Sequence, residues 1–182
     1  MSVHIVDNKI YSSQVLRVNY TTYDVRRDQD SLNPRTHSDV MVLSREDNPQ
    51  AHPYWYARVL GVFHLRVLHI DPSTTNRSVQ YMEVLWVRWF GLVPGHRFGS
   101  KVARLPKIGF IQDTDPLAFG FLDPSLVIRA THLIPAFNDG CTAELLATSP
   151  TAGRPPGETD DWAAFFVSMY VFQSVYVDGS IF

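Results

Sequence analysis

Two long apolar runs separated by a polar segment restrict the folds open to this chain. Residues Tyr54 to Ile70 (YWYARVLGVFHLRVLHI) and Val79 to Phe90 (VQYMEVLWVRWF) are rich in β-branched and aromatic residues, which favour strands. The segment between them, DPSTTNRS at positions 71–78, has the composition of a turn. The first run is longer than an average strand, and Gly61 marks the expected position of a bulge or bend within it. The pattern therefore predicts two long strands joined by a turn.

Shorter runs with strand character lie on both sides of this pair. They are residues 11–24, which are rich in Tyr, Thr and Val, residues 39–44 (DVMVLS) and residues 126–137 (LVIRATHLIPAF). Successive strands joined by polar turns are typical of an antiparallel sheet that curls on itself. We therefore expect a mainly β fold, a small antiparallel barrel with long loops and little α-helix.

A segment rich in proline and glycine divides the chain near its end. SPTAGRPPGE, at positions 149–158, is expected to be a linker, so that residues 11–148 form the β-rich domain. Residues 159–182 are expected to form a C-terminal helix and a tail. Asp160 and Asp161 would lie in the first turn of a helix over DDWAAFFVSMYVF, where acids are stabilised by the helix dipole.

The charges are unevenly distributed along the chain. The formal net charge of -2 argues against a generally basic nucleic-acid binder. Residues 84–112, however, carry five basic residues and no acid, whereas residues 113–182 carry two basic and nine acidic residues. Exposed basic side chains of the first segment would contact phosphates. The candidates for such contacts are Arg97, Lys101, Arg104 and Lys107. The alternative is an ordinary solvated loop that the acidic C-terminal third neutralises.

The two long runs also carry an unusual number of aromatic residues. Because side chains alternate between the faces of a strand, one face suits a core: Trp55, Leu85, Val87 and Trp89. The opposite face would present an aromatic wall with an arginine: Tyr54, Tyr56, Trp86, Arg88 and Phe90. An exposed wall of this kind attracts methylammonium groups by cation–π contacts and stacks unpaired bases. The alternative is that the C-terminal helix or residues 91–123 cover this face.

No catalytic or metal-binding pattern competes with these surfaces. The seven histidines have no telling spacing to one another or to acids, and no glycine-rich phosphate loop or nucleophile elbow is present. We therefore expect a non-enzymatic protein without a cofactor or metal ion. A divergent nuclease or hydrolase would need acids from distant loops to converge, namely Asp28, Asp30, Asp113 and Asp115.

Cysteine content and the N-terminal sequence bear on the compartment. Cys141 is the only cysteine, so no disulfide can form within the chain, which favours a reducing environment. The first residues, MSVHIVDNKI, lack the basic start and apolar run of a signal peptide, and no apolar stretch has the length needed to cross a membrane. These features predict an intracellular protein.

The chain contains six blocks of distinctive sequence: NYTTYDVRRDQDSLNPRTHSDVMVLS, HPYWYARVLGVFH, VLWVRWFG, ARLPKIGF, FGFLDPSLVIRATHLIPAF and GETDDWAAFFV. These blocks resemble one region of proteins encoded by basidiomycete cut-and-paste DNA transposons of the Plavaka and KDZ-like kind. The resemblance runs from about Asn19 to Val167 and implies a nuclear context. The last residues, VFQSVYVDGSIF, depart from the basic, glycine-rich end of that region.

Three short segments follow a second pattern: residues 39–42 (DVMV), 56–59 (YARV) and 84–90 (VLWVRWF). They resemble the strands of bromo-adjacent homology (BAH) and other SH3-like chromatin modules. Many BAH domains are chromatin or protein-interaction modules, and some read methylated histone tails. The resemblance implies an SH3/BAH-like barrel, and it leaves the ligand open because SH3-like barrels bind many things.

The function expected from these features is a non-catalytic nuclear module, derived from a transposon protein, that binds chromatin through DNA or a histone tail. The alternative is a protein–protein scaffold or self-association module of a transposase complex. That module would use the same aromatic surface and would have no affinity for nucleic acid.

Overall fold

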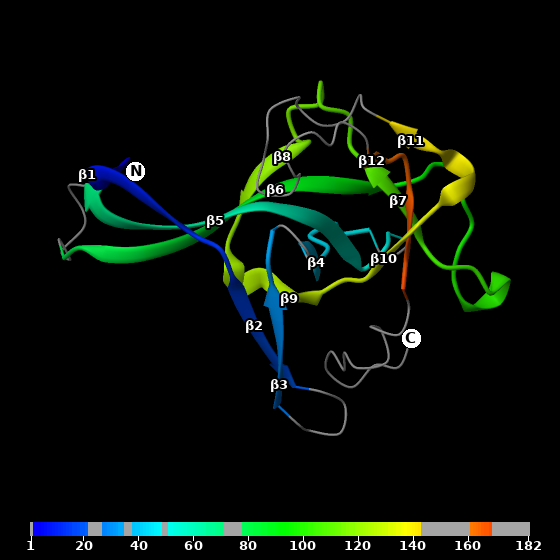
Figure 1. The fold of residues 1–182 in the computed structure, drawn as a ribbon, viewed down its shortest axis with the longest axis horizontal. Coiled ribbons are helices and arrows are strands. Elements are labelled where there is room, and N and C mark those ends of the chain that lie inside the picture. Colours follow the sequence, from blue (N-terminus) through cyan, green and yellow to red (C-terminus); the bar gives the residue numbers. More distant parts are fainter. Residues whose placement is uncertain are drawn as a thin grey trace.

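The computed structural model describes residues 2–21, 27–34, 38–48, 51–70, 78–142 and 161–168. The described residues are mainly β, and most strands belong to one curled antiparallel sheet that forms a half-barrel (Figure 1), which confirms the predicted fold class. The strands are β1 (Ser2–Ser13), β2 (Leu16–Thr21), β3 (Arg27–Leu32), β4 (Asp39–Leu43), β5 (Tyr54–Ile70), β6 (Gln80–Leu92), β7 (Lys107–Phe110), β8 (Phe119–Leu122), β9 (Val127–Ala130), β10 (Leu133–Pro135), β11 (Cys141–Thr142), β12 (Asp161–Trp162) and β13 (Phe165–Val167). Three short 3-10 helices are η1 (Ser100–Val102), η2 (Pro124–Leu126) and η3 (Phe137–Asp139).

The two long runs of the sequence form the central strands β5 and β6. They pair antiparallel from Tyr56↔Phe90 to Val67↔Gln80, and the register shifts between Val59 and Gly61, which confirms the predicted bulge. The main sheet has the order β10-β13-β7-β6-β5-β4-β9, with β8 paired to β6 and β1 paired to β5. The far halves of β5 and β6 extend with β1 as a three-stranded arm away from the half-barrel (Figure 1).

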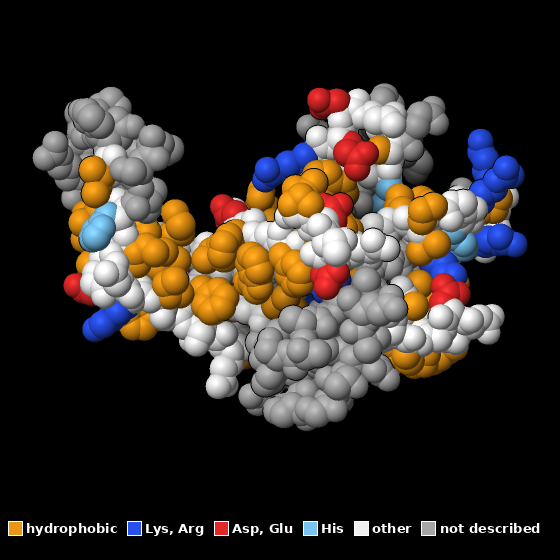
Figure 2. Space-filling model, turned by 90° about the horizontal axis from the view of Figure 1, so that it is seen from above, with side chains coloured by type: hydrophobic (Ala, Val, Ile, Leu, Met, Phe, Trp, Pro, Cys, Tyr) orange, Lys and Arg blue, Asp and Glu red, His pale blue; other side chains and the backbone are white. Residues whose placement is uncertain are grey.

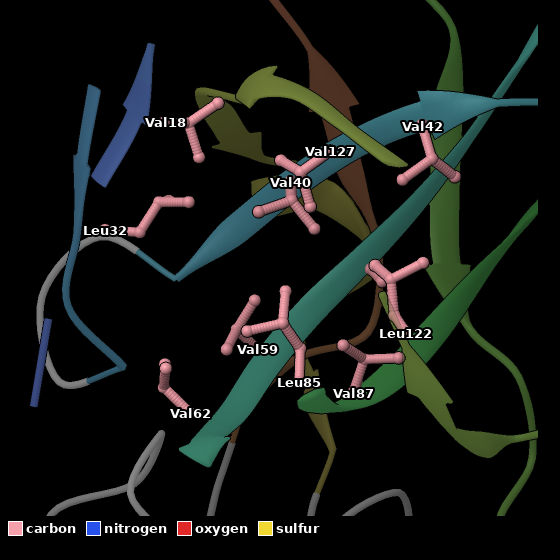
Figure 3. Packing of buried hydrophobic residues seen from close by; sticks show 11 residues of the cluster. Val18, Leu32, Val40, Val42, Val59, Val62, Leu85, Val87, Leu122 and Val127 are labelled. Atoms are coloured by element: carbon pink, nitrogen blue, oxygen red, sulfur yellow. The ribbon is translucent and has the colours of Figure 1, made fainter. Parts of the chain in front are cut away.

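The part of the sheet around β5 and β6 is buried on both faces. The concave face holds the first hydrophobic cluster (Figure 3), which contains the predicted core residues Leu85 and Val87, each fully buried. The second cluster, which includes Met41 and Tyr56, lies on the opposite side with residues of β7 and β13. Strands β7 and β13 therefore cover the face that the aromatic wall was expected to expose.

The prediction of a helix after the linker is wrong for the residues that the structure describes. Residues 161–168 contain the strands β12 and β13, and β13 is inserted between β7 and β10 of the main sheet. Phe165 and Val167 are buried, whereas Phe166 between them is half-buried, as expected of alternating strand residues. The predicted linker and residues 169–182 lie outside the described residues. No helix in the described part of the chain is long and apolar enough to span a membrane.

Gly109 of β7 is packed tightly against the connection between β12 and β13. A β-carbon at Gly109 would lie 3.0 Å from the main-chain oxygen of Ala163, so we expect Gly109→Ala to lower the free energy of unfolding by about 1–3 kcal/mol. Gly91, its cross-strand partner, is the control because an added β-carbon there would lie 3.6 Å from Ile111 Cγ1. Urea unfolding measures both variants. Equal effects at the two positions would contradict the close contact.

Candidate functional site

The predicted aromatic wall is mostly buried, so its expected exposure is wrong. Tyr56, Arg88 and Phe90 have exposed fractions of 2%, 0% and 6%. Trp86 is half-buried, and its ring centroid lies 5.8 Å from that of Phe119 and 4.8 Å from that of Phe121. Three of the five residues of the predicted wall are therefore closed to a ligand.

The rings of this buried region bind two arginines of the chain itself. The Arg58 guanidinium lies 5.0–5.6 Å from the ring centroids of Phe90, Phe110 and Phe165. The Arg88 guanidinium lies 4.9 Å from the Phe110 ring centroid and 4.8 Å from that of Phe119. The cation–π contacts that the sequence suggested for a ligand are therefore made within the protein.

Arg58 also links three strands through two carboxylates. Its Nε donates to Asp39 Oδ1 of β4 at 2.8 Å, and its Nη1 donates to Asp161 Oδ2 of β12 at 2.5 Å. All three side chains are mostly buried, with exposed fractions of 12–16%. Burial raises the pKa of the Asp39 carboxyl, and the Arg58 guanidinium opposes that rise. This ion cluster, together with its aromatic surroundings, ties β12 to the face of the sheet.

Tyr54, which is half-buried, and Tyr56, which is buried, both contact a histidine. The His52 ring lies 5.9 Å from the Tyr54 ring and stacks on Tyr56, and its Nε2 is 2.8 Å from the Tyr56 hydroxyl oxygen. Burial lowers the pKa of His52 and raises the pKa of both tyrosines. Phe98 contacts the same imidazole edge-on at 5.3 Å. This aromatic group therefore fixes the loop that follows β6 against the sheet.

The four basic residues predicted to contact phosphates lie in different environments. Lys107 is half-buried, with its Nζ 2.6 Å from Asp139 Oδ2 and 5.6 Å from the Phe166 ring centroid, so its expected exposure is wrong. The acidic C-terminal third neutralises this lysine. Arg97, Lys101 and Arg104 are exposed on the loop between β6 and β7. Figure 2 shows Lys and Arg side chains gathered at that end of the molecule.

Trp55 and Trp89 line a groove on the other side of the sheet. It has a volume of about 490 Å³ and lies between β4, β8, η2 and β9, with the two tryptophans contributed by β5 and β6. The two indoles meet edge to face, with ring centroids 6.0 Å apart and an interplanar angle of 78°. Its rim carries three exposed apolar side chains: Leu43, Phe121 and Leu126.

Carboxylates flank this tryptophan groove. Trp55 Nε1 donates a hydrogen bond of 3.0 Å to Glu46 Oε1, and Asp123 lines the groove directly. Hydrogen bonds from Ser125 lower the pKa of Asp123, which keeps its carboxyl ionised. Arg45 also lines the groove, but within the described residues no arginine or lysine is placed over either indole. The indole faces are thus free of the internal cations that fill the opposite side of the sheet.

Gly120 of β8 allows Trp89 its position in the groove. A β-carbon at Gly120 would lie only 3.1 Å from Trp89 Nε1, so any side chain there would displace the indole. The sequence assigned Trp55 and Trp89 to the core and not to a binding site. The register of β5 and β6 is the feature from which the pair of tryptophans could be predicted. In this register Trp89 is opposite Ala57 and therefore diagonal to Trp55 on the same face.

Two of the four acids considered for metal-dependent chemistry, Asp30 and Asp115, accept hydrogen bonds from the main chain. Asp30 Oδ2 accepts a hydrogen bond from the main chain of Ala130, and Asp115 Oδ1 accepts one from the main chain of Leu117. Across the described ranges, no group of three or more His, Cys, Asp or Glu side chains could hold a metal ion. No family model, curated protein or solved structure matches the chain.

Proposed function

We propose that the protein is a non-catalytic module that binds a basic peptide, with a methylated lysine of that peptide held by Trp55 and Trp89. The observation that carries this proposal is the edge-to-face pair of indoles that lines the groove. A methylammonium group placed against the faces of two such rings gains roughly 0.5–2 kcal/mol from each cation–π contact. Histone tails are peptides of this chemistry, in keeping with the nuclear, chromatin-associated role expected from the sequence.

The surroundings of the indoles fit a cationic, extended partner. Glu46 and Asp123 supply two carboxylates against the single guanidinium of Arg45, so the local charge favours a cation. The exposed apolar rim formed by Leu43, Phe121 and Leu126 offers contacts for side chains next to the modified lysine. A peptide would therefore bind through both its charge and its apolar neighbours.

The test compares a charged probe with its neutral isostere. We expect a peptide with a central trimethyllysine to bind about tenfold more tightly than the same peptide with a carbon atom in place of the quaternary nitrogen. Isothermal titration calorimetry measures both affinities, and tetramethylammonium chloride serves as a competitor. Equal affinity for the two peptides would contradict cation recognition and would leave an apolar protein–protein surface, as in the scaffold alternative.

A further inference from the structure

The loop between β6 and β7 holds three cations on a preformed turn. Gly99 N donates to the Arg104 main-chain oxygen at 2.9 Å, and Arg104 N donates back to Gly99 O at 3.4 Å, which closes the turn around η1. Gly99 and Ala103 have φ angles of 109° and 50°, a region in which glycine is favoured. We call the exposed side chains of this loop the basic tip: Arg97, Lys101 and Arg104.

The basic tip keeps its charge available to a partner. Residues 84–112 contain no acid, and the other two basic residues of that segment, Arg88 and Lys107, are held inside the fold. None of the ion pairs formed among the described residues includes a side chain of the basic tip. Like charges held close together on one turn repel one another, and an anionic partner relieves that repulsion.

The aromatic residue of this loop is already engaged. Phe98 is half-buried, and its ring lies edge-on against His52 with the ring centroids 5.3 Å apart. Val102, with 43% of its surface exposed, is the apolar side chain at the turn. Because the exposed charged side chains of the basic tip are all cations, the groups of a partner that they fit are anionic.

We propose that the basic tip binds the sugar–phosphate backbone of duplex nucleic acid without sequence preference. Three cations displace about three condensed counterions, which predicts that the logarithm of the affinity falls with the logarithm of salt concentration with a slope of about -2.7. The affinity would then drop about 40-fold between about 50 and 200 mM salt. This surface is separate from the tryptophan groove, and either can bind without the other.

Two matched variants of the whole chain test the proposal. Arg97→Gln/Lys101→Gln/Arg104→Gln removes the basic tip, and Lys9→Gln/Arg17→Gln/Arg27→Gln removes three other exposed cations. Fluorescence anisotropy with two labelled duplexes of unrelated sequence measures affinity across the salt range. We expect the tip variant to lose at least about tenfold in affinity and most of the salt slope, with the control unchanged within about twofold.

Three results would overturn the proposal. They are no binding by the unmodified protein at low salt, equal losses in the two variants, or a strong preference for one duplex sequence. Thermal melting followed by far-UV circular dichroism shows whether the tip variant is folded, so that a lost contact with nucleic acid is not mistaken for unfolding.

Discussion

Arg58→Met is expected to lower the free energy of unfolding by about 3–5 kcal/mol, because it leaves the carboxylates of Asp39 and Asp161 without their cation in a mostly buried site. Methionine keeps apolar contact with the rings of Phe90 and Phe110, so the loss reports mainly on charge. Urea unfolding followed by far-UV circular dichroism measures the change.

Two further variants separate the cause of this loss from a general effect of removing arginine. Arg66→Met removes a much more exposed ion pair, in which Arg66 Nη2 lies 2.7 Å from Asp7 Oδ2. This substitution is expected to lower the free energy of unfolding by less than about 1 kcal/mol. Adding Asp39→Asn and Asp161→Asn to Arg58→Met is expected to recover part of the stability, because no unpaired charge then stays buried. If Arg58→Met costs no more than Arg66→Met, the buried ion cluster does not hold β12 in place.

Loss of either indole is expected to have the largest effect on ligand binding. Trp55→Leu and Trp89→Leu should each weaken binding of the trimethyllysine peptide by about tenfold or more, since each removes one cation–π contact and one wall of the groove. Trp89→Phe keeps an aromatic face and should retain part of the affinity. Isothermal titration calorimetry at one salt concentration measures the affinity of all three variants for the peptide.

The control for these variants is Tyr81→Leu on the three-stranded arm. Tyr81 is an aromatic side chain with 78% of its surface exposed, and it lies far along β6 from the groove. Its replacement should leave the affinity unchanged. A loss as large as that of Trp89→Leu would show that the peptide binds exposed aromatic residues without regard to the groove, and thermal melting identifies any variant that is unfolded.

The strands of this fold are visible in the sequence because their physical causes are local. The alternation in VLWVRWF assigned Leu85 and Val87 to the core, and Gly61 marked the bulge that β5 needs to pair with β6. Period-two alternation defines two faces, however, and does not say how each face is covered. Phe110 and Phe165, which pack against Phe90, come from segments far along the chain.

The mistaken helix has a similar origin. DDWAAFFV begins with acids and continues with apolar residues, which suits a helix, but Phe165 pairs with Ile108 and Pro135 in the sheet. These long-range pairings outweigh local preference, as is common for short buried strands.

The tryptophan groove could be predicted only in part. Cross-strand register places Trp55 and Trp89 together on one face, and this much follows from pairing the two runs. The groove also requires that β8, η2 and β9 line it together with β4, and that Gly120 leaves space for the Trp89 indole. Nothing in the local sequence specifies this arrangement of segments, so strand alternation alone places the two tryptophans in the core.

The most direct test of the proposed function is a nuclear magnetic resonance titration that follows the indole N–H signals of the four tryptophans. On addition of the trimethyllysine peptide, we expect the largest shifts at Trp55 and Trp89. The indole N–H signal of Trp162, which packs against Phe137 and the second hydrophobic cluster, should not shift. Binding without a shift at Trp55 and Trp89, or with its largest shift at Trp162, would contradict recognition in the tryptophan groove.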